Sequence, residues 1–224
     1  MGKITIMPET TKDPISLIGR CSGVCQGRDI EDLKKNYKRG INCIKSGHGR
    51  TLEYVDIYTI IDGYSARVIR EWYTHIGGAP TRLQASTRYI DYENLEAFWP
   101  SSISNNEDAT AAYNSALSII SLSYKHMIEA GVPREDAANI LPLGMLTKIV
   151  DKRNVRNVMD MSRQRMCNRA YHEFRQLFND YLKALSEYSD EWKELIDMIM
   201  MPKCEALGYC PEEKSCGRMP KKEN

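Results

Sequence analysis

One alternating segment, from Tyr54 to Asp62, sets the kind of fold that this chain can adopt. Apolar or β-branched residues occupy every second position on one side of it: Val55, Ile57, Thr59 and Ile61. A period of two predicts a strand with one buried face. Most of the remaining chain has helical spacing instead, so we predict one α+β domain over residues 1–224.

Helical periodicity and caps predict the other elements. We expect helices over residues 29–46, 65–73, about 106–130, roughly 152–162, 168–185 and 191–200. Gly63 is predicted to end the strand, and Ser65 to cap the helix that follows it. A strand or loop is expected from Leu141 through Val150. The tail from about residue 203 is predicted to be weakly structured.

The helix over 106–130 and the segment 76–89 can be predicted in more detail. The inward face of the helix over 106–130 is predicted to contain Ala112, Ala116, Ile119, Ile120 and Met127. Residues 76–89 begin with a Gly-Gly pair and a nearby proline, which predicts an irregular loop. Backbone N–H groups in such a loop can approach a ligand closely.

Residues 148–175 concentrate positive charge in a nearly neutral chain. They contain eight Lys and Arg against three Asp and Glu, an excess of five. The whole chain has 31 basic and 30 acidic residues and a net charge of +1. A local excess of this kind indicates a defined anionic ligand rather than a general polyanion surface, so we expect no nucleic-acid partner.

Within this basic segment, Asn154 and Arg165 are eleven residues apart. This is about three turns, so one unbroken helix aligns their side chains. Arg156, Asp160 and Arg163 then lie on roughly the opposite side. Polar function on both sides of one helix is natural where subunits meet. The alternative is an ordinary solvated basic helix.

The turn after the glycine loop, Gln84-Ala85-Ser86-Thr87-Arg88-Tyr89, is a second candidate site. Its amide, hydroxyl and guanidinium can hold a phosphate and read a base edge. The alternative is an ordinary polar turn. His48 and His75 are each either cofactor contacts or structural histidines.

The seven cysteines are an odd number, which predicts reduced thiols in a cytoplasmic protein. Cys204, Cys210 and Cys216 are spaced more widely than the usual zinc-binding pairs, so no metal is expected. No run of eighteen apolar residues and no apolar signal segment occur, so we expect neither a membrane span nor secretion. A GxGxxG fingerprint is also missing, so any flavin or nicotinamide binds outside a Rossmann fold.

Taken in order, these motifs resemble the flavin-dependent thymidylate synthases, the ThyX family. The matching segments are Gly47-His48 with Leu52-Glu53, Arg70-Glu71-Trp72-Tyr73-Thr74-His75, the turn Gln84–Tyr89, Leu141-Pro142, Asn154-Val155-Arg156, and Arg165-Met166-Cys167-Asn168-Arg169-Ala170. No single motif decides the resemblance. Their shared order along most of the chain carries it.

The resemblance implies an α+β domain with a mixed sheet flanked by long helices, assembled as a homotetramer whose subunits share active sites. It implies reductive methylation of dUMP to dTMP. FAD is then the hydride carrier, NADPH the reductant and methylenetetrahydrofolate the carbon donor.

The resemblance also implies residue roles. Arg165 is the implied catalytic residue, facing the uracil and favouring its N3-deprotonated form. The implied substrate-binding residues are Glu71, Gln84, Ser86, Thr87, Arg88 and Arg165. The implied cofactor-binding residues are His48, His75, Asn154, Arg156 and Asp160.

The chain departs from the family in one loop. The family signature is Arg-His-Arg, seven residues, then Ser, whereas this chain has Thr74-His75-Ile76, nine residues, then Ser86. We expect Arg70, Arg82 or the Gly77-Gly78 backbone to supply the lost anion contacts. The altered loop leaves two alternatives: a relative that modifies C5 of a pyrimidine nucleotide differently, for example by hydroxymethylation, or a non-catalytic nucleotide-binding protein.

Overall fold

A computed structural model describes residues 2–222. Four strands in this range form one sheet, in the order β1-β2-β4-β3. They are β1 (Lys3–Ile6), β2 (Asp56–Ser65), β3 (Thr81–Gln84) and β4 (Leu146–Asn154). All three neighbouring pairs are antiparallel, so the expected mixed sheet is wrong. The reason is that β4 inserts between β2 and β3, which run in the same direction.

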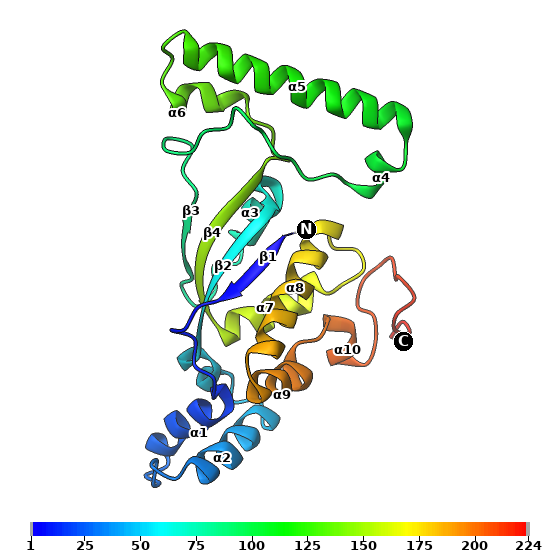
Figure 1. Cartoon of the computed structure of the whole chain (residues 1–224). Helices are drawn as coiled ribbons and strands as arrows, with labels where there is room; N and C mark the ends of the chain where they lie inside the picture. Colours follow the sequence, from blue (N-terminus) through cyan, green and yellow to red (C-terminus); the bar gives the residue numbers. More distant parts are fainter. Residues whose placement is uncertain (1, 223–224) are drawn as a thin grey trace.

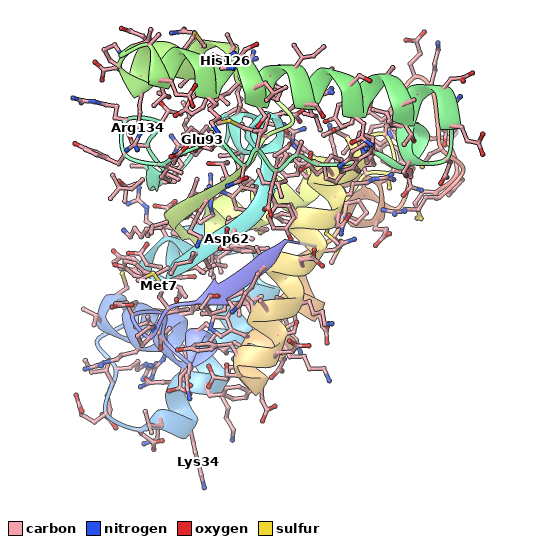
Figure 2. All side chains as sticks on the ribbon, turned by 45° about the horizontal axis from the view of Figure 1, so that its top comes forward. Met7, Lys34, Asp62, Glu93, His126 and Arg134 are labelled. Carbon is pink, nitrogen blue, oxygen red and sulfur yellow. The ribbon has the colours of Figure 1, made fainter. Side chains whose placement is uncertain are left out.

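The helices lie on one side of this sheet and extend beyond both of its ends (Figure 1). They are α1 (Pro14–Cys25), α2 (Leu33–Lys45), α3 (Ala66–Trp72), α4 (Ser101–Ser104), α5 (Glu107–Glu129), α6 (Arg134–Ala137), α7 (Val155–Arg165), α8 (His172–Tyr188), α9 (Asp190–Ile199) and α10 (Lys203–Leu207), with the short 3₁₀ helices η1 (Gly49–Tyr54) and η2 (Ala138–Ile140). The α1–α2 pair lies at one end of the molecule and α5 at the other. Lys34 and His126 mark these two ends in Figure 2.

The predicted half-buried strand is confirmed in β2. Val55, Ile57, Thr59 and Ile61 are fully buried on one side. Val55, Ile57 and Ile61 join residues of α3, α7, α8 and α9 in the main core. This face of the sheet, covered by helices, is where apolar burial contributes most to folding.

The predicted end of this strand at Gly63 is wrong. Gly63 has φ 73° and forms a bulge at which the register between β2 and β4 shifts, and the strand continues to Ser65. Ser65 then caps α3 as predicted, its Oγ accepting from the backbone N–H of Val68 at 3.1 Å. The buried carboxylate of Glu173 accepts from both N–H and O–H of Ser65, which ties α8 to the start of α3.

The start of the basic helix also differs from the prediction. The last residues of β4 are 152–154, and α7 begins only at Val155. Burial alternates through this part of β4, with Asp151 and Arg153 buried and Lys152 partly exposed, as in a strand. The next predicted helix, over 168–185, begins four residues later than expected, at His172.

The predicted irregular loop over residues 76–89 is only partly confirmed. It is irregular through Pro80, but Thr81–Gln84 then forms β3, which pairs with β4 from Thr81↔Lys152 to Gln84↔Ile149. The free edge of β4 supplies backbone partners that the sequence pattern does not reveal.

The long helix α5 has the predicted extent, and Asn106 caps it by accepting from the N–H of Ala109. Its predicted inward face is only partly confirmed: Met127 packs inward, but Ala112, Ala116 and Ile119 are exposed and Ile120 is partly exposed. The helix contacts the protein through Tyr124, which meets Tyr92 edge-on in a small second cluster. Within residues 2–222, one side of α5 therefore has no cover.

The tail is more ordered than predicted. It forms α10, and Cys204 and Cys210 are buried. Arg218 donates to the backbone carbonyl of Met166 and to Oδ1 of Asn168, both at 2.8 Å. These contacts hold the tail against the connection between α7 and α8.

All seven cysteines are free, as predicted. Among residues 2–222, no helix is both long enough and apolar enough to cross a membrane. Nor do any three His, Cys, Asp or Glu side chains in that range have an arrangement that can hold a metal ion.

Candidate functional site

The start of α7 lies against the glycine loop. Asn154 caps the helix, its Oδ1 accepting from the N–H of Asn157 at 2.9 Å, and its Nδ2 lies 3.4 Å from the carbonyl oxygen of Gly78. Gly78 has φ 72°, and a Cβ there would come within 2.4 Å of the Asn154 Nδ2. Glycine is therefore required at this position on both conformational and steric grounds.

The end of α7 carries a cluster of charged and aromatic groups. The Nε of Arg165 donates to Nε2 of His75 at 2.9 Å, and its Nη1 lies 3.2 Å from Oε2 of Glu71. The guanidinium lies over the ring of Phe174, 4.4 Å from its centroid. Three separate contacts therefore fix the plane of a side chain that is one-fifth exposed.

His75 is held neutral in this cluster. Burial, followed by the positive charges of Arg165 and Arg153, lowers its pKa from 6.5 to about 4. A neutral ring accepts the Arg165 hydrogen bond at Nε2, whereas a protonated ring has only donors. Asn157 also contacts this residue, its Nδ2 lying 3.4 Å from the His75 carbonyl oxygen.

The predicted placement of Asn154 and Arg156 on different sides of α7 agrees with their contacts, but Arg163, predicted on the side of Arg156, lines the same cavity as Arg165. Asn154 and Arg165 both contact the 75–78 loop. Arg156, on the same helix, contacts a different element: its Nη1 would be 1.9 Å from a Cβ at Gly49, the first residue of η1. The Nε of Arg156 also pairs with Asp160 at 3.5 Å. His48, directly before η1, is exposed beside this pair of elements.

A buried ion pair that the sequence did not predict lies between the start of α7 and the end of α3. Arg153 donates to both carboxylate oxygens of Asp151, at 2.5 and 2.8 Å, and both side chains are completely buried. Arg153 Nη1 also donates to Oδ1 of Asn157 at 2.6 Å, and the guanidinium lies 4.3 Å from the centroid of the Trp72 ring. The alternation along β4 was the available signal, but the predicted strand or loop ended at Val150, and Arg153 was assigned to the helix expected from residue 152.

The third group of candidate residues lies at the other end of the sheet. Gln84 contacts Thr147 through its Nε2 at 3.3 Å, and the N–H of Arg88 donates to Ser86 Oγ at 3.3 Å. Arg88 pairs with Glu135 of α6 at 2.7 Å. Thr87 is part of the same turn. The structure thus places this turn beside α6 and not beside Arg165.

The candidate residues therefore form three groups within one chain. The groups are Glu71, His75, Asn154 and Arg165; His48, Arg156 and Asp160; and Gln84, Ser86, Thr87 and Arg88. Of the residues expected to replace the missing arginines, Arg82 donates to the Tyr73 carbonyl at 2.9 Å and covers the Tyr73 ring at 4.2 Å. Arg70 is exposed on α3.

Comparison with known proteins identifies the family. Residues 7–189 match the model of the thymidylate synthase complementing protein family, which takes in all three groups. The chain belongs to the family of flavin-dependent thymidylate synthases. A flavin-dependent thymidylate synthase of Pyrococcus furiosus is 31% identical over 186 residues, which cover 81% of this chain and 74% of the relative.

Other members of the family match over comparable or greater lengths. A flavin-dependent thymidylate synthase of Nitratidesulfovibrio vulgaris is 29% identical over 187 residues, covering 79% of this chain and 74% of the relative. One from Geobacter sulfurreducens is 26% identical over 226 residues, covering 96% and 94%. The resemblance stated from the motifs is therefore confirmed.

Proposed function

We propose that this chain is a flavin-dependent thymidylate synthase that methylates dUMP reductively to dTMP. Methylenetetrahydrofolate supplies the carbon, and NADPH reduces the bound FAD. Family membership supports the activity. The observation that carries it within this structure is the fixed guanidinium of Arg165, held by Glu71 and His75.

Arg165 is proposed to act on the uracil ring. A guanidinium keeps its charge at any working pH and offers paired N–H donors to the oxygens of an ionised base. Stabilising the N3-deprotonated uracil makes C5 more nucleophilic, so no enzyme thiol has to add to the ring. Among residues 2–222, Glu71 and His75 occupy Nη1 and Nε of Arg165, which leaves its Nη2 without a protein acceptor and free to face a ligand.

The residues present fit a flavin along α7 and η1. A flavin supplies hydride transfer when bound. Arg156 is 41% exposed with a single acidic partner, so it retains donors for an anionic group, and Asn154 presents an amide beside the Gly77-Gly78 backbone. His48 and Asp160 border the same surface. His75, held neutral, adds no positive charge there.

The nucleotide phosphate is proposed to bind Ser86 and Arg88, with Gln84, Thr87 and Glu71 at the base or sugar. Because this turn and Arg165 lie on separate parts of one chain, a complete site takes the two groups from different subunits. We therefore propose a homotetramer with shared sites. The uncovered side of α5 supports such an assembly, since Ile119 is 64% and Leu122 58% exposed.

Expression in a thymidine auxotroph tests this function. The chain is expected to restore growth without thymidine, and Arg165→Ala to abolish that rescue. Purified protein is expected to show flavin absorbance and to convert dUMP to a product with the mass of dTMP. A hydroxymethylated product would favour the alternative C5 chemistry, and colourless protein that binds dUMP would favour the non-catalytic alternative.

The replacement for the missing arginines has its own test. Arg82 is proposed to supply anion contacts from β3, since only one of its nitrogens donates to Tyr73. Arg82→Ala is expected to weaken FAD or dUMP binding, measured by equilibrium dialysis. Unchanged affinity for both ligands would remove Arg82 from this role and leave Arg70 and the Gly77-Gly78 backbone.

A further inference from the structure

A cavity of about 480 Å³ lies between the end of α7, the connection to α8 and the tail. We call it the tail cavity. Five basic side chains and one acidic side chain line it: Arg163, Arg165, Arg169, Lys203, Lys214 and Glu212. Its volume is in the range of small-molecule sites. Lys203, Glu212 and Lys214 lie beyond residue 189, the last residue that the family model matches.

Most of this positive charge is not neutralised by the protein. Arg165 pairs with Glu71, and Arg169 pairs with Glu212 at 3.5 Å. Within residues 2–222, the other three cations, Arg163, Lys203 and Lys214, have no ion pair. Like charges gathered around one cavity repel each other, and a bound anion removes that repulsion.

The tail is held in position to form one wall of the cavity. Arg169 donates to the backbone carbonyl of Lys214 at 3.3 Å, and Arg218 donates to Met166 and Asn168. The chain then closes on itself, with the N–H of Cys210 donating to the Pro220 carbonyl at 2.6 Å. These contacts hold Lys214 beside Arg169 of the α7–α8 connection, and Lys203 of α10 lines the same cavity.

We propose that the tail cavity binds the multiply anionic end of a cosubstrate, a proposal that rests on the function proposed above. The shared chemistry is a small molecule with two or more anionic groups: the phosphates of a nicotinamide dinucleotide or the glutamate carboxylates of a folate. Arg165 lines the cavity, so a ligand whose anionic end lies near Lys203 and Lys214 has its other end beside the proposed uracil position.

Cys216 gives this proposal a direct binding readout. It lines the cavity and is exposed. The backbone N–H of Arg218, the Asn168 amide and the Arg218 charge lower the pKa of its thiol, which favours the reactive thiolate. Cys25, exposed on α1 and outside the tail cavity, serves as the internal control.

The first experiment uses inorganic tripolyphosphate as the probe. The full chain is alkylated with iodoacetamide, and the rate at each cysteine is followed by mass spectrometry. Millimolar tripolyphosphate is expected to slow alkylation of Cys216 several-fold and to leave Cys25 unchanged. An unchanged rate at Cys216, or equal slowing at both cysteines, would overturn the proposal.

The second experiment distinguishes the two sources of the anion. The triple variant Arg163→Gln, Lys203→Gln, Lys214→Gln is compared with Lys193→Gln, a control on the exposed side of α9. Calorimetry measures binding of NADP⁺ against NAD⁺, and of tetrahydrofolate triglutamate against the monoglutamate. The triple variant is expected to bind one of the more anionic ligands at least about tenfold more weakly.

The outcomes separate this proposal from the function on which it rests. Calorimetry needs no turnover, so weakened anion binding in a chain that forms no dTMP would retain the cavity's role and remove the proposed reaction. Conversely, unchanged affinity of the triple variant for both NADP⁺ and the triglutamate would overturn the cavity proposal while dTMP formation continues. Equal affinity for dUMP in both variants confirms that the fold is intact.

Discussion

The imidazole of His75 accepts a hydrogen bond from the guanidinium of Arg165, with 2.9 Å between Nε2 and Nε. This arrangement requires a neutral ring. Burial and the charges of Arg165 and Arg153 produce it by lowering the His75 pKa to about 4. His75 belongs to the loop that departs from the family signature. Its ring thus positions Arg165.

The same pair predicts a pH dependence of stability. Between pH 6.5 and about 4, the unfolded chain protonates His75 and the folded chain does not, so the unfolded state binds more protons. Stability therefore decreases as pH falls through this window. His75→Gln retains an acceptor without a titrating ring, so its melting temperature is expected to fall less steeply over that range. Circular dichroism melts at several pH values measure this, and parallel slopes in the two proteins would contradict it.

The buried pair of Asp151 and Arg153 predicts an asymmetric mutational response. Asp151→Asn leaves the Arg153 charge buried without its partner and is expected to cost about 3–5 kcal/mol of unfolding free energy. The double variant Asp151→Leu, Arg153→Met removes both charges at similar volume and is expected to cost much less. Urea denaturation measures both free energies. A double variant as unstable as the single one would show that the charges themselves are needed.

Gly78 predicts a link between loop conformation and flavin binding. Gly78→Ala is expected to cost about 1–2 kcal/mol from its positive φ and more from the contact with Asn154. Gly131→Ala is the matched control, because Gly131 has φ 84° and nothing within 4 Å of an added Cβ. Only Gly78→Ala is expected to lose flavin absorbance, since only it displaces the Asn154 cap. Equal flavin content in both variants would separate Asn154 from the flavin.

Short-range sequence patterns correctly predicted the elements whose formation depends mainly on neighbouring residues. The period of two in β2, the Ser65 cap of α3 and the extent of α5 each depend on neighbouring residues, and each was found. The strand β3 was missed because its only reason to form is the free edge of β4. The end of β4 was mistaken for helix because Arg153 is polar, and only its buried partner Asp151 explains why it faces the core.

In the candidate site, too, spacing along one helix was predictable and contacts between distant residues were not. Sequence spacing alone placed Asn154 and Arg165 on one side of α7 and Arg156 on another, and the contacts confirm this. The Arg165 contact with His75 was not predicted, because it joins residues 90 positions apart in the sequence. The tail was judged weakly structured from its composition, since its order depends on contacts that Arg169 and Arg218 make across the chain.

Glu71 predicts how the charge beside the uracil is set. Its carboxylate lies 3.2 Å from Nη1 of Arg165 and offsets part of the positive charge proposed to stabilise the ionised base. Glu71→Gln retains an oxygen acceptor but removes the negative charge. The uracil is then expected to ionise more easily, so the pH at half-maximal kcat falls by about 1 unit.

Glu71→Ala is the control for this prediction, because it removes the hydrogen bond as well as the charge. Arg165 then loses one of the contacts that fix its plane, so kcat is expected to fall at every pH, since misplacing a group of the site slows the reaction. Initial rates of dTMP formation across the pH range measure both variants. An unshifted profile for Glu71→Gln would show that the carboxylate does not act on the uracil, whereas a fall in kcat shared by both variants would assign Glu71 to positioning alone.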